Sequence, residues 1–92
     1  MTPSLTNGPI RALLVAPARG GTWLRELTLP FPPFPGLGIR LDVYDMVNVD
    51  SVVVGDDNRW KIDVTCIVSM GGGGTPTAAD WLRLGFEEGV YV

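Results

Sequence analysis

One stretch limits what this chain can fold into. Residues 29–43 read LPFPPFPGLGIRLDV, with four prolines and two phenylalanines between residues 30 and 35. Proline fixes φ near about −65° and lacks a backbone N–H, so this segment can continue neither a helix nor the hydrogen-bond ladder of a central strand. The sequence therefore predicts a stiff, extended segment over residues 30–36, the proline arm, with strands before and after it.

A short apolar run and four segments in which apolar and polar residues largely alternate predict five strands. They cover Ile10–Val15, Trp23–Leu29, Leu37–Tyr44, Val47–Val54 and Trp60–Val68. The first run is short enough that one turn of helix would also fit it, and we favour a strand. The alternation fails at Ser51, which either a β-bulge or a passage into a fully covered strand would explain. The turn-forming residues 55–59 predict a five-residue hairpin loop between the last two strands.

Helix start signals gather after a run of four glycines at residues 71–74. Thr77 and Asp80 form a capping box, while Thr75 with Pro76 offers an alternative start. An apolar stripe should then lie on the sheet. It consists of Ala78, Trp81, Leu82 and Phe86. Gly89 is the expected C-cap, and residues 90–92 are expected to add a short final strand or a tail that docks on a neighbour.

These elements predict the fold class and the domain organisation. We expect an α+β fold, a mostly antiparallel sheet of about four to six strands with one C-terminal helix packed on it. The chain of 92 residues has no long linker, so residues 1–92 should form a single domain, with an N-terminal arm over residues 1–9 and the proline arm. The N-terminal apolar patch is too short for a signal peptide, and no run reaches the about 20 apolar residues of a membrane span.

The composition points to an interface. Apolar residues make up 46% of the chain and charged residues only 18%, below the roughly 25% of an average soluble domain. Either some apolar surface ends against another chain, or glycine and proline take places that charged residues usually fill. The net charge of −3 comes from ten carboxylates and seven cations that are intermixed along the sequence. Without a basic cluster, nucleic-acid binding through a basic patch is excluded.

Residues that could carry chemistry are few. The chain has no histidine and one cysteine, which excludes an internal disulfide and the usual zinc sites and suits a reducing compartment. Cys66 falls on an apolar strand face and is expected to be a buried thiol. Asp42, Asp45 and Asp50 lack the spacing of a calcium-binding loop and are expected to be solvated turn residues. We predict no catalytic residue, no metal site and no cofactor.

The residues LPFPPFPGLGIRL, the valine-rich hairpin after them and Trp60 resemble small uncharacterised proteins of tailed-bacteriophage genomes. The resemblance covers Leu24 to Val68. It implies a phage setting, in which such proteins serve as virion or neck components or as inhibitors of host machinery. The implied location is the cytoplasm of a host cell or the virion, without secretion. It carries over no functional residue.

The remaining expectation is a non-enzymatic protein–protein interaction module, a phage-encoded virion or assembly component, whose partner is a second copy or another protein. The expected anchors are Phe31, Phe34 and Leu37, with Val90 and Tyr91 as a second contact. The alternative for the arm is that it folds back and caps one end of the sheet. An alternative function is an inhibitor of a host enzyme or defence complex. Its charged contacts would be Asp56, Asp57 and Arg59. A small anion-binding domain at residues 71–77 is the third possibility.

Overall fold

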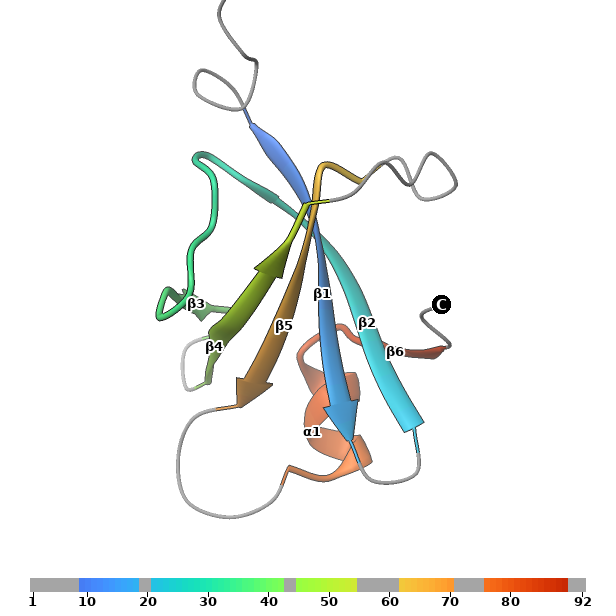
Figure 1. Ribbon diagram of the computed structural model, residues 1–92. Helices are drawn as coiled ribbons and strands as arrows, with labels where there is room; N and C mark the ends of the chain where they lie inside the picture. Colours follow the sequence, from blue (N-terminus) through green and yellow to red (C-terminus); the bar gives the residue numbers. More distant parts are fainter. Residues whose placement is uncertain (1–8, 19–20, 43–44, 55–61, 71–75, 90–92) are drawn as a thin grey trace, which may run out of the picture.

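The structure is a computed structural model that describes residues 9–18, 21–42, 45–54, 62–70 and 76–89 (Figure 1). Its elements are β1 (Ile10–Ala18), β2 (Gly21–Leu29), β3 (Gly38–Arg40), β4 (Met46–Val53), β5 (Val64–Met70), α1 (Ala78–Arg83) and β6 (Glu87–Gly89). The strands form one sheet in the order β3-β4-β5-β1-β2-β6. Every neighbouring pair is antiparallel except β1 with β5. The predicted α+β class with a mostly antiparallel sheet is confirmed.

Strand β1 lies at the centre of the sheet and is buried on both faces. Its residues Ile10 and Ala12 to Ala16 are all buried. Antiparallel pairing with β2 and parallel pairing with β5 satisfy its backbone on both edges. An apolar run with few polar interruptions is typical of such a doubly covered strand. The strand predicted over Ile10–Val15 is therefore confirmed, and it extends to Ala18.

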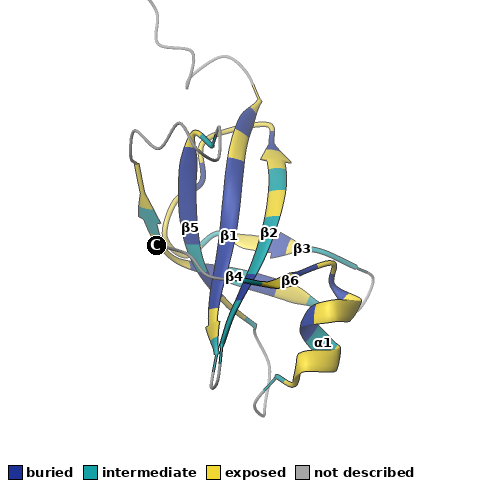
Figure 2. Cartoon of the chain, turned by 90° about the vertical axis from the view of Figure 1, so that its right-hand side faces the viewer, coloured by how far each residue is buried: buried dark blue, intermediate teal, exposed yellow. Residues whose placement is uncertain are grey.

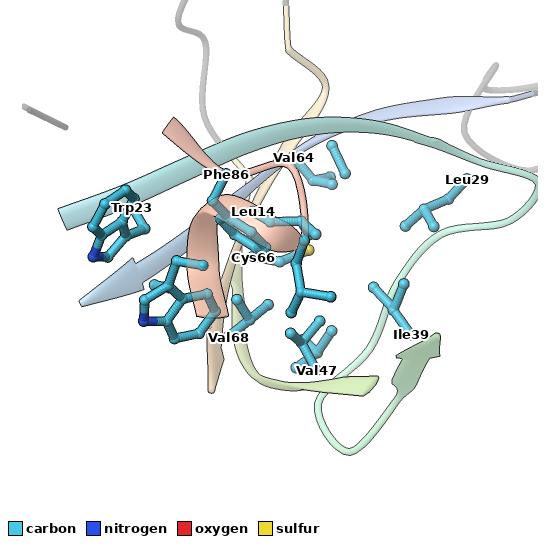
Figure 3. Packing of buried hydrophobic residues seen from close by; sticks show 14 of the residues in the cluster. Leu14, Trp23, Leu29, Ile39, Val47, Val64, Cys66, Val68 and Phe86 are labelled. Carbon is cyan, nitrogen blue, oxygen red and sulfur yellow. The ribbon is translucent and has the colours of Figure 1, made fainter. Parts of the chain in front are cut away.

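The hydrophobic core lies on one face of this sheet, where α1 and the segment after it cover the strands (Figure 2). Its buried members are Ile10, Ala12, Leu14, Ala16, Trp23, Leu29, Ile39, Val47, Val49, Val64, Cys66, Val68, Trp81, Leu84 and Phe86. Phe86 lies close to Leu14 of β1 and Cys66 of β5 in the same cluster (Figure 3). The period-2 pattern of the strands supplies most of these side chains.

The valine-rich strand carries the predicted bulge. Val49 pairs with Val68, but Ser51 pairs with Ile67, so Asp50 is the extra residue on β4. A fully covered strand after Ser51, the other explanation, is wrong, because Val53 is 50% exposed. Strand β5 begins at Val64, later than predicted. Trp60 and the loop at residues 55–59 lie outside the described residues.

The proline arm is the crossover of the sheet. It leaves β2 at Leu29 and must reach β3 on the far side of β4, β5 and β1 (Figure 1). Four strand spacings amount to about 19 Å. The connection from Leu29 to Gly38 spans about 28 Å when extended as polyproline II but only about 13 Å as an α-helix. A helical connection would therefore be too short, and the prolines disfavour a helix here.

The strand predicted after the arm is shorter than expected. It was predicted over Leu37–Tyr44, but β3 covers only Gly38–Arg40. The side chain of Asp42 stops it, because Oδ1 accepts a hydrogen bond of 2.6 Å from the backbone N–H of Asp45. Asp commonly forms such local turns, which compete with strand pairing. Residues 43 and 44 lie outside the described residues.

Helix α1 begins as predicted and ends earlier. Thr77 is the N-cap, and the complete capping box with Asp80 is present. The C-cap prediction at Gly89 is wrong, because the helix ends at Arg83 and Gly89 belongs to β6. Gly85, at φ 86°, ends the helix instead. Leu82, assigned to the buried stripe, is 60% exposed.

A Schellman motif explains this early end. The N–H of Gly85 donates to the carbonyl of Leu82 at 3.0 Å, and the N–H of Phe86 donates to the carbonyl of Trp81, also at 3.0 Å. The motif brings the rings of Trp81 and Phe86 together edge to face, 5.0 Å apart. Such an apolar contact across the helix end is a regular companion of the motif. Phe86 therefore enters the core from the segment after the helix, and not from the apolar stripe of the helix to which it was assigned.

The Schellman motif predicts the effect of Gly85→Ala. An added Cβ would meet only the Arg25 guanidinium at 3.5 Å or more, which is ordinary contact, so the cost comes from the positive φ. We expect the unfolding free energy to fall by about 1 kcal/mol, or the melting temperature by about 4–8 °C. Gly85→Asn should lose less, because asparagine tolerates this conformation. Thermal denaturation of both variants checks this, and an alanine variant as stable as the wild type would contradict it.

Candidate functional site

The proline arm ends in a tight turn. The N–H of Leu37 donates to the carbonyl of Phe34 at 3.1 Å. Between them stand Pro35 and Gly36, and Gly36 has φ 95°. Proline at the second position and a residue of positive φ at the third are the signature of a type II turn. The Pro-Gly pair in the sequence therefore fixes the direction in which the arm rejoins the sheet.

Two further hydrogen bonds tie this turn to β4. Gly36 donates its N–H to the carbonyl of Val49 at 2.8 Å, and Val49 donates its N–H to the carbonyl of Leu37 at 2.8 Å. Leu37 is half-buried against the core. Pro33 is buried as well. The arm is thus held to the body of the protein at its middle and at its end.

The two phenylalanines of the arm point away from this contact. Phe31 is 45% exposed and Phe34 is 52% exposed. Pro32 and Pro35 are exposed too. Residues three apart share a face of a polyproline helix, so Phe31 and Phe34 have the spacing of one face. The arm presents two large apolar rings on a segment that is itself held in place.

The other predicted partner-binding residues fall elsewhere. Leu37 packs against the core and attaches the end of the arm to it, so it is not an exposed anchor. Val90 and Tyr91 lie outside the described residues. The alternative charged contacts, Asp56, Asp57 and Arg59, lie outside them as well.

Sequence reasoning missed two exposed valines. Val53 is 50% exposed and Val54 is 68% exposed. Val53 pairs with Thr65, and Thr65 with Leu13, toward the end of the sheet at which β2 enters the arm. The bulge after Val49 was the available signal, because an extra residue reverses which side chains face the core.

Two of the acidic residues weighed as calcium ligands, Asp42 and Asp45, bind an arginine instead. Nη1 of Arg83 lies 2.7 Å from Oδ2 of Asp42, and Nη2 lies 2.5 Å from Oδ2 of Asp45 and 3.6 Å from Oδ1 of Asp80. The hydrogen bond that Arg83 donates to the Asp45 carboxylate is the main reason why the pKa of Arg83 is raised. This cluster clamps α1 to the turn between β3 and β4. Among the described residues, no group of three or more side chains is placed to hold a metal ion.

Thr77 and Asp80 satisfy each other's donors at the start of α1. The backbone N–H of Thr77 donates to Oδ2 of Asp80 at 2.9 Å, and the Thr77 hydroxyl donates to the same oxygen at 3.1 Å. These two bonds, the backbone one first, lower the pKa of Asp80. A carboxylate of the chain itself therefore sits where an anion would bind, which disfavours an anion site here. Residues 71–75 lie outside the described part of the chain.

Cys66 is a core residue. It is 0% exposed, on the face of β5 that packs in the core, as its place in the sequence predicted. Burial raises the pKa of its thiol to about 11. The thiolate is the nucleophilic form of cysteine, so this side chain is poorly suited to covalent chemistry.

Comparison of the chain with family models, curated proteins and solved structures finds no match. The phage setting implied by the sequence resemblance therefore stays a prediction. None of the helical residues that the structure describes forms a segment of the length and apolarity that a membrane span needs.

The Arg83 cluster predicts a salt-dependent loss of stability in Arg83→Met. Methionine keeps the apolar stem but removes the ion pairs to Asp42, Asp45 and Asp80. The melting temperature should fall in low salt, and the difference from the wild type should shrink in 1 M NaCl, because salt screens exposed pairs. Arg11→Met is the matched control, since the ion pair that Arg11 makes within the described part of the chain, with Glu26, is longer at 3.8 Å. If the melting temperature fell equally in both variants, or fell independently of salt, the ion pairs of Arg83 would not be what holds α1 to the turn between β3 and β4.

Proposed function

We propose that this protein is a non-enzymatic interaction module that docks on another protein through Phe31 and Phe34. The observation that carries the proposal is the exposure of both rings, 45% and 52%, on an arm that is tied to β4. Exposed apolar side chains that gather into a patch often mark a protein-interaction site. A protein surface with an apolar hollow is the partner that fits.

The energetics favour docking by this arm. Covering the exposed half of each phenyl ring is worth about 1 kcal/mol. The prolines and the contacts of Gly36, Leu37 and Pro33 hold the arm before it binds. Little conformational entropy is then lost on association, which is the usual benefit of a preorganised segment. Two phenyl rings can therefore serve as anchors even in a small contact.

Three side chains that could take part in chemistry already have structural roles, which supports the non-enzymatic part of the proposal. The thiol of Cys66 is buried with a raised pKa. Asp80 caps α1, and Arg83 binds three carboxylates. Each of these side chains already has a structural partner or place. If the phage resemblance holds, the partner would be a virion or assembly protein, or a host protein that the module inhibits.

The test compares Phe34 with Leu82, which is similarly exposed at 60% but stands on α1. Phe34→Asp should change the unfolding free energy by less than about 0.5 kcal/mol, because the ring is at the surface. It should abolish partner binding, whereas Leu82→Asp should not. The measurement is cross-linking from a photoreactive phenylalanine placed at position 34 or 82 in the cells that make the protein.

We expect a discrete cross-linked protein from position 34 only, lost when Phe31→Asp is added. Light scattering over a range of concentrations reports whether that protein is a second copy. Equal labelling from both positions, or no adduct at position 34 together with a monomer at every concentration, would overturn the proposal.

A further inference from the structure

Strand β4 has an outer edge that is only partly paired. Strand β3 pairs with residues 46–48 along this edge (Figure 1). The turn after the proline arm bonds to the next residue, Val49. In the part of the chain that the structure describes, no strand or turn pairs with the outer edge of residues 51–54, which we call the open edge. Its outward-pointing N–H and C=O groups are therefore available to another strand.

The open edge lacks the usual protection of a sheet edge. Such edges are normally protected by charged residues, prolines or bulges, and β6, at the other side of the sheet, carries two exposed glutamates. Residues 51–54 read SVVV, without charge or proline. The bulge at Asp50 precedes them, and their pairing with β5 is regular. Val53 is 50% exposed and Val54 is 68% exposed. An apolar, regular and exposed edge is a template for strand addition.

We propose that the open edge pairs with the open edge of a second copy, antiparallel to it, about a two-fold axis at Val53. The inference goes beyond the proposed function, because it concerns the sheet and not the arm. In such a symmetric contact Val53 faces the second copy's Val53, and Val52 faces the second copy's Val54. Cross-strand pairs of β-branched side chains stabilise an antiparallel sheet.

The charges around the open edge select this register. If the axis lay at Val52, Asp50 would face Val54. If it lay at Val54, Asp56 would face Val52. With the axis at Val53, residues 51–54 face residues 52–55 of the second copy, and none of these carries a charge. An axis between two residues would pair side chains from opposite faces of the sheet, which the pleat does not allow.

The same feature selects the occupant. Covering the valines with a charged strand would take its charges out of water without a partner, which is costly. The strand that fits is therefore uncharged and apolar over the length of the open edge. The open edge of a second copy meets this requirement, and its own unpaired N–H and C=O groups are satisfied in the same contact.

The contact closes on itself, because pairing uses the open edge of both copies at once. Association should therefore stop at a dimer, in which two six-stranded sheets join into one. The open edge is about 13 Å long. Stable complexes involve about 20–30 residues on each side, so a contact of this size should be weak. The fraction of dimer should accordingly rise with protein concentration.

Charges placed at the axis test the register. Val53→Lys and Val53→Glu each put two like charges directly opposite one another, which destabilises the pair. Each variant should stay monomeric in sedimentation velocity at concentrations where the wild type approaches the mass of a dimer. An equimolar mixture of the two should dimerise again, because lysine then faces glutamate. Leu82→Lys is the matched control and should dimerise like the wild type, since Leu82 is 60% exposed but stands on α1.

A disulfide across the axis tests the distance between the two strands. Opposite residues of an antiparallel pair have Cα atoms about 4.5–5.5 Å apart, within the range of a disulfide. Val53→Cys should therefore form a covalent dimer under mild oxidation. The native Cys66 is buried and should not react. Met46→Cys is the control and should stay unlinked, because Met46 is also exposed but lies where β3 already pairs with β4.

Three results would overturn the inference. They are a wild type that stays monomeric at every concentration, a Val53→Lys variant that dimerises like the wild type, and a mixture of the two charged variants that stays monomeric. Equal cross-linking from positions 46 and 53 would overturn it as well, because the axis would not lie at Val53. The proposed function is decided separately, by cross-linking from position 34.

Discussion

The fold depends on the pairing of β1 with two neighbours that run in different directions. Strand β2 is antiparallel to β1 and β5 is parallel to it. A chain that has completed the β1–β2 hairpin must therefore cross the sheet before it can return as β3, β4 and β5. The proline arm is that crossing, and the distance it covers is too long for a helix of the same number of residues. Its unusual composition thus serves the topology of the sheet.

The arm was expected either to fold back on the sheet or to bind a partner. Its inner side does the first, and its outer side is available for the second. Pro33 and Leu37 face the body of the protein, and the hydrogen bonds of Gly36 and Val49 fasten the turn after them. Phe31 and Phe34 face outward. A segment of this kind is stiff because the fold requires it, and the same stiffness lowers the entropy lost when its outer side binds. The arm is needed to connect β2 with β3, and the proposed binding requires only that it also carry Phe31 and Phe34.

Local patterns predicted most of the elements, and contacts between distant residues account for the errors. The strands around residues 10–29, the bulge before Ser51 and the capping box depend on neighbours in the sequence, so they could be predicted. The end of α1 at Gly85 could not, because Gly89 and the position of Phe86 suggested a longer helix. The pairing of Arg83 with Asp42 joins residues 41 apart. Phe31 and Phe34 are exposed because the face of the arm that carries Pro33 packs against the protein. No periodic pattern in the sequence shows which face of the arm will be buried.

Amide hydrogen exchange tests the central claim, that the arm is held in place while its rings are exposed. The decisive protons are the N–H groups of Gly36, Leu37 and Val49, which donate to Val49, Phe34 and Leu37. We predict that all three exchange together and with protection similar to that of the paired amides in β4. If the amides of Gly36 and Leu37 exchanged at the rates of an unfolded peptide while β4 stayed protected, the arm would be a loose linker and would not be held against β4.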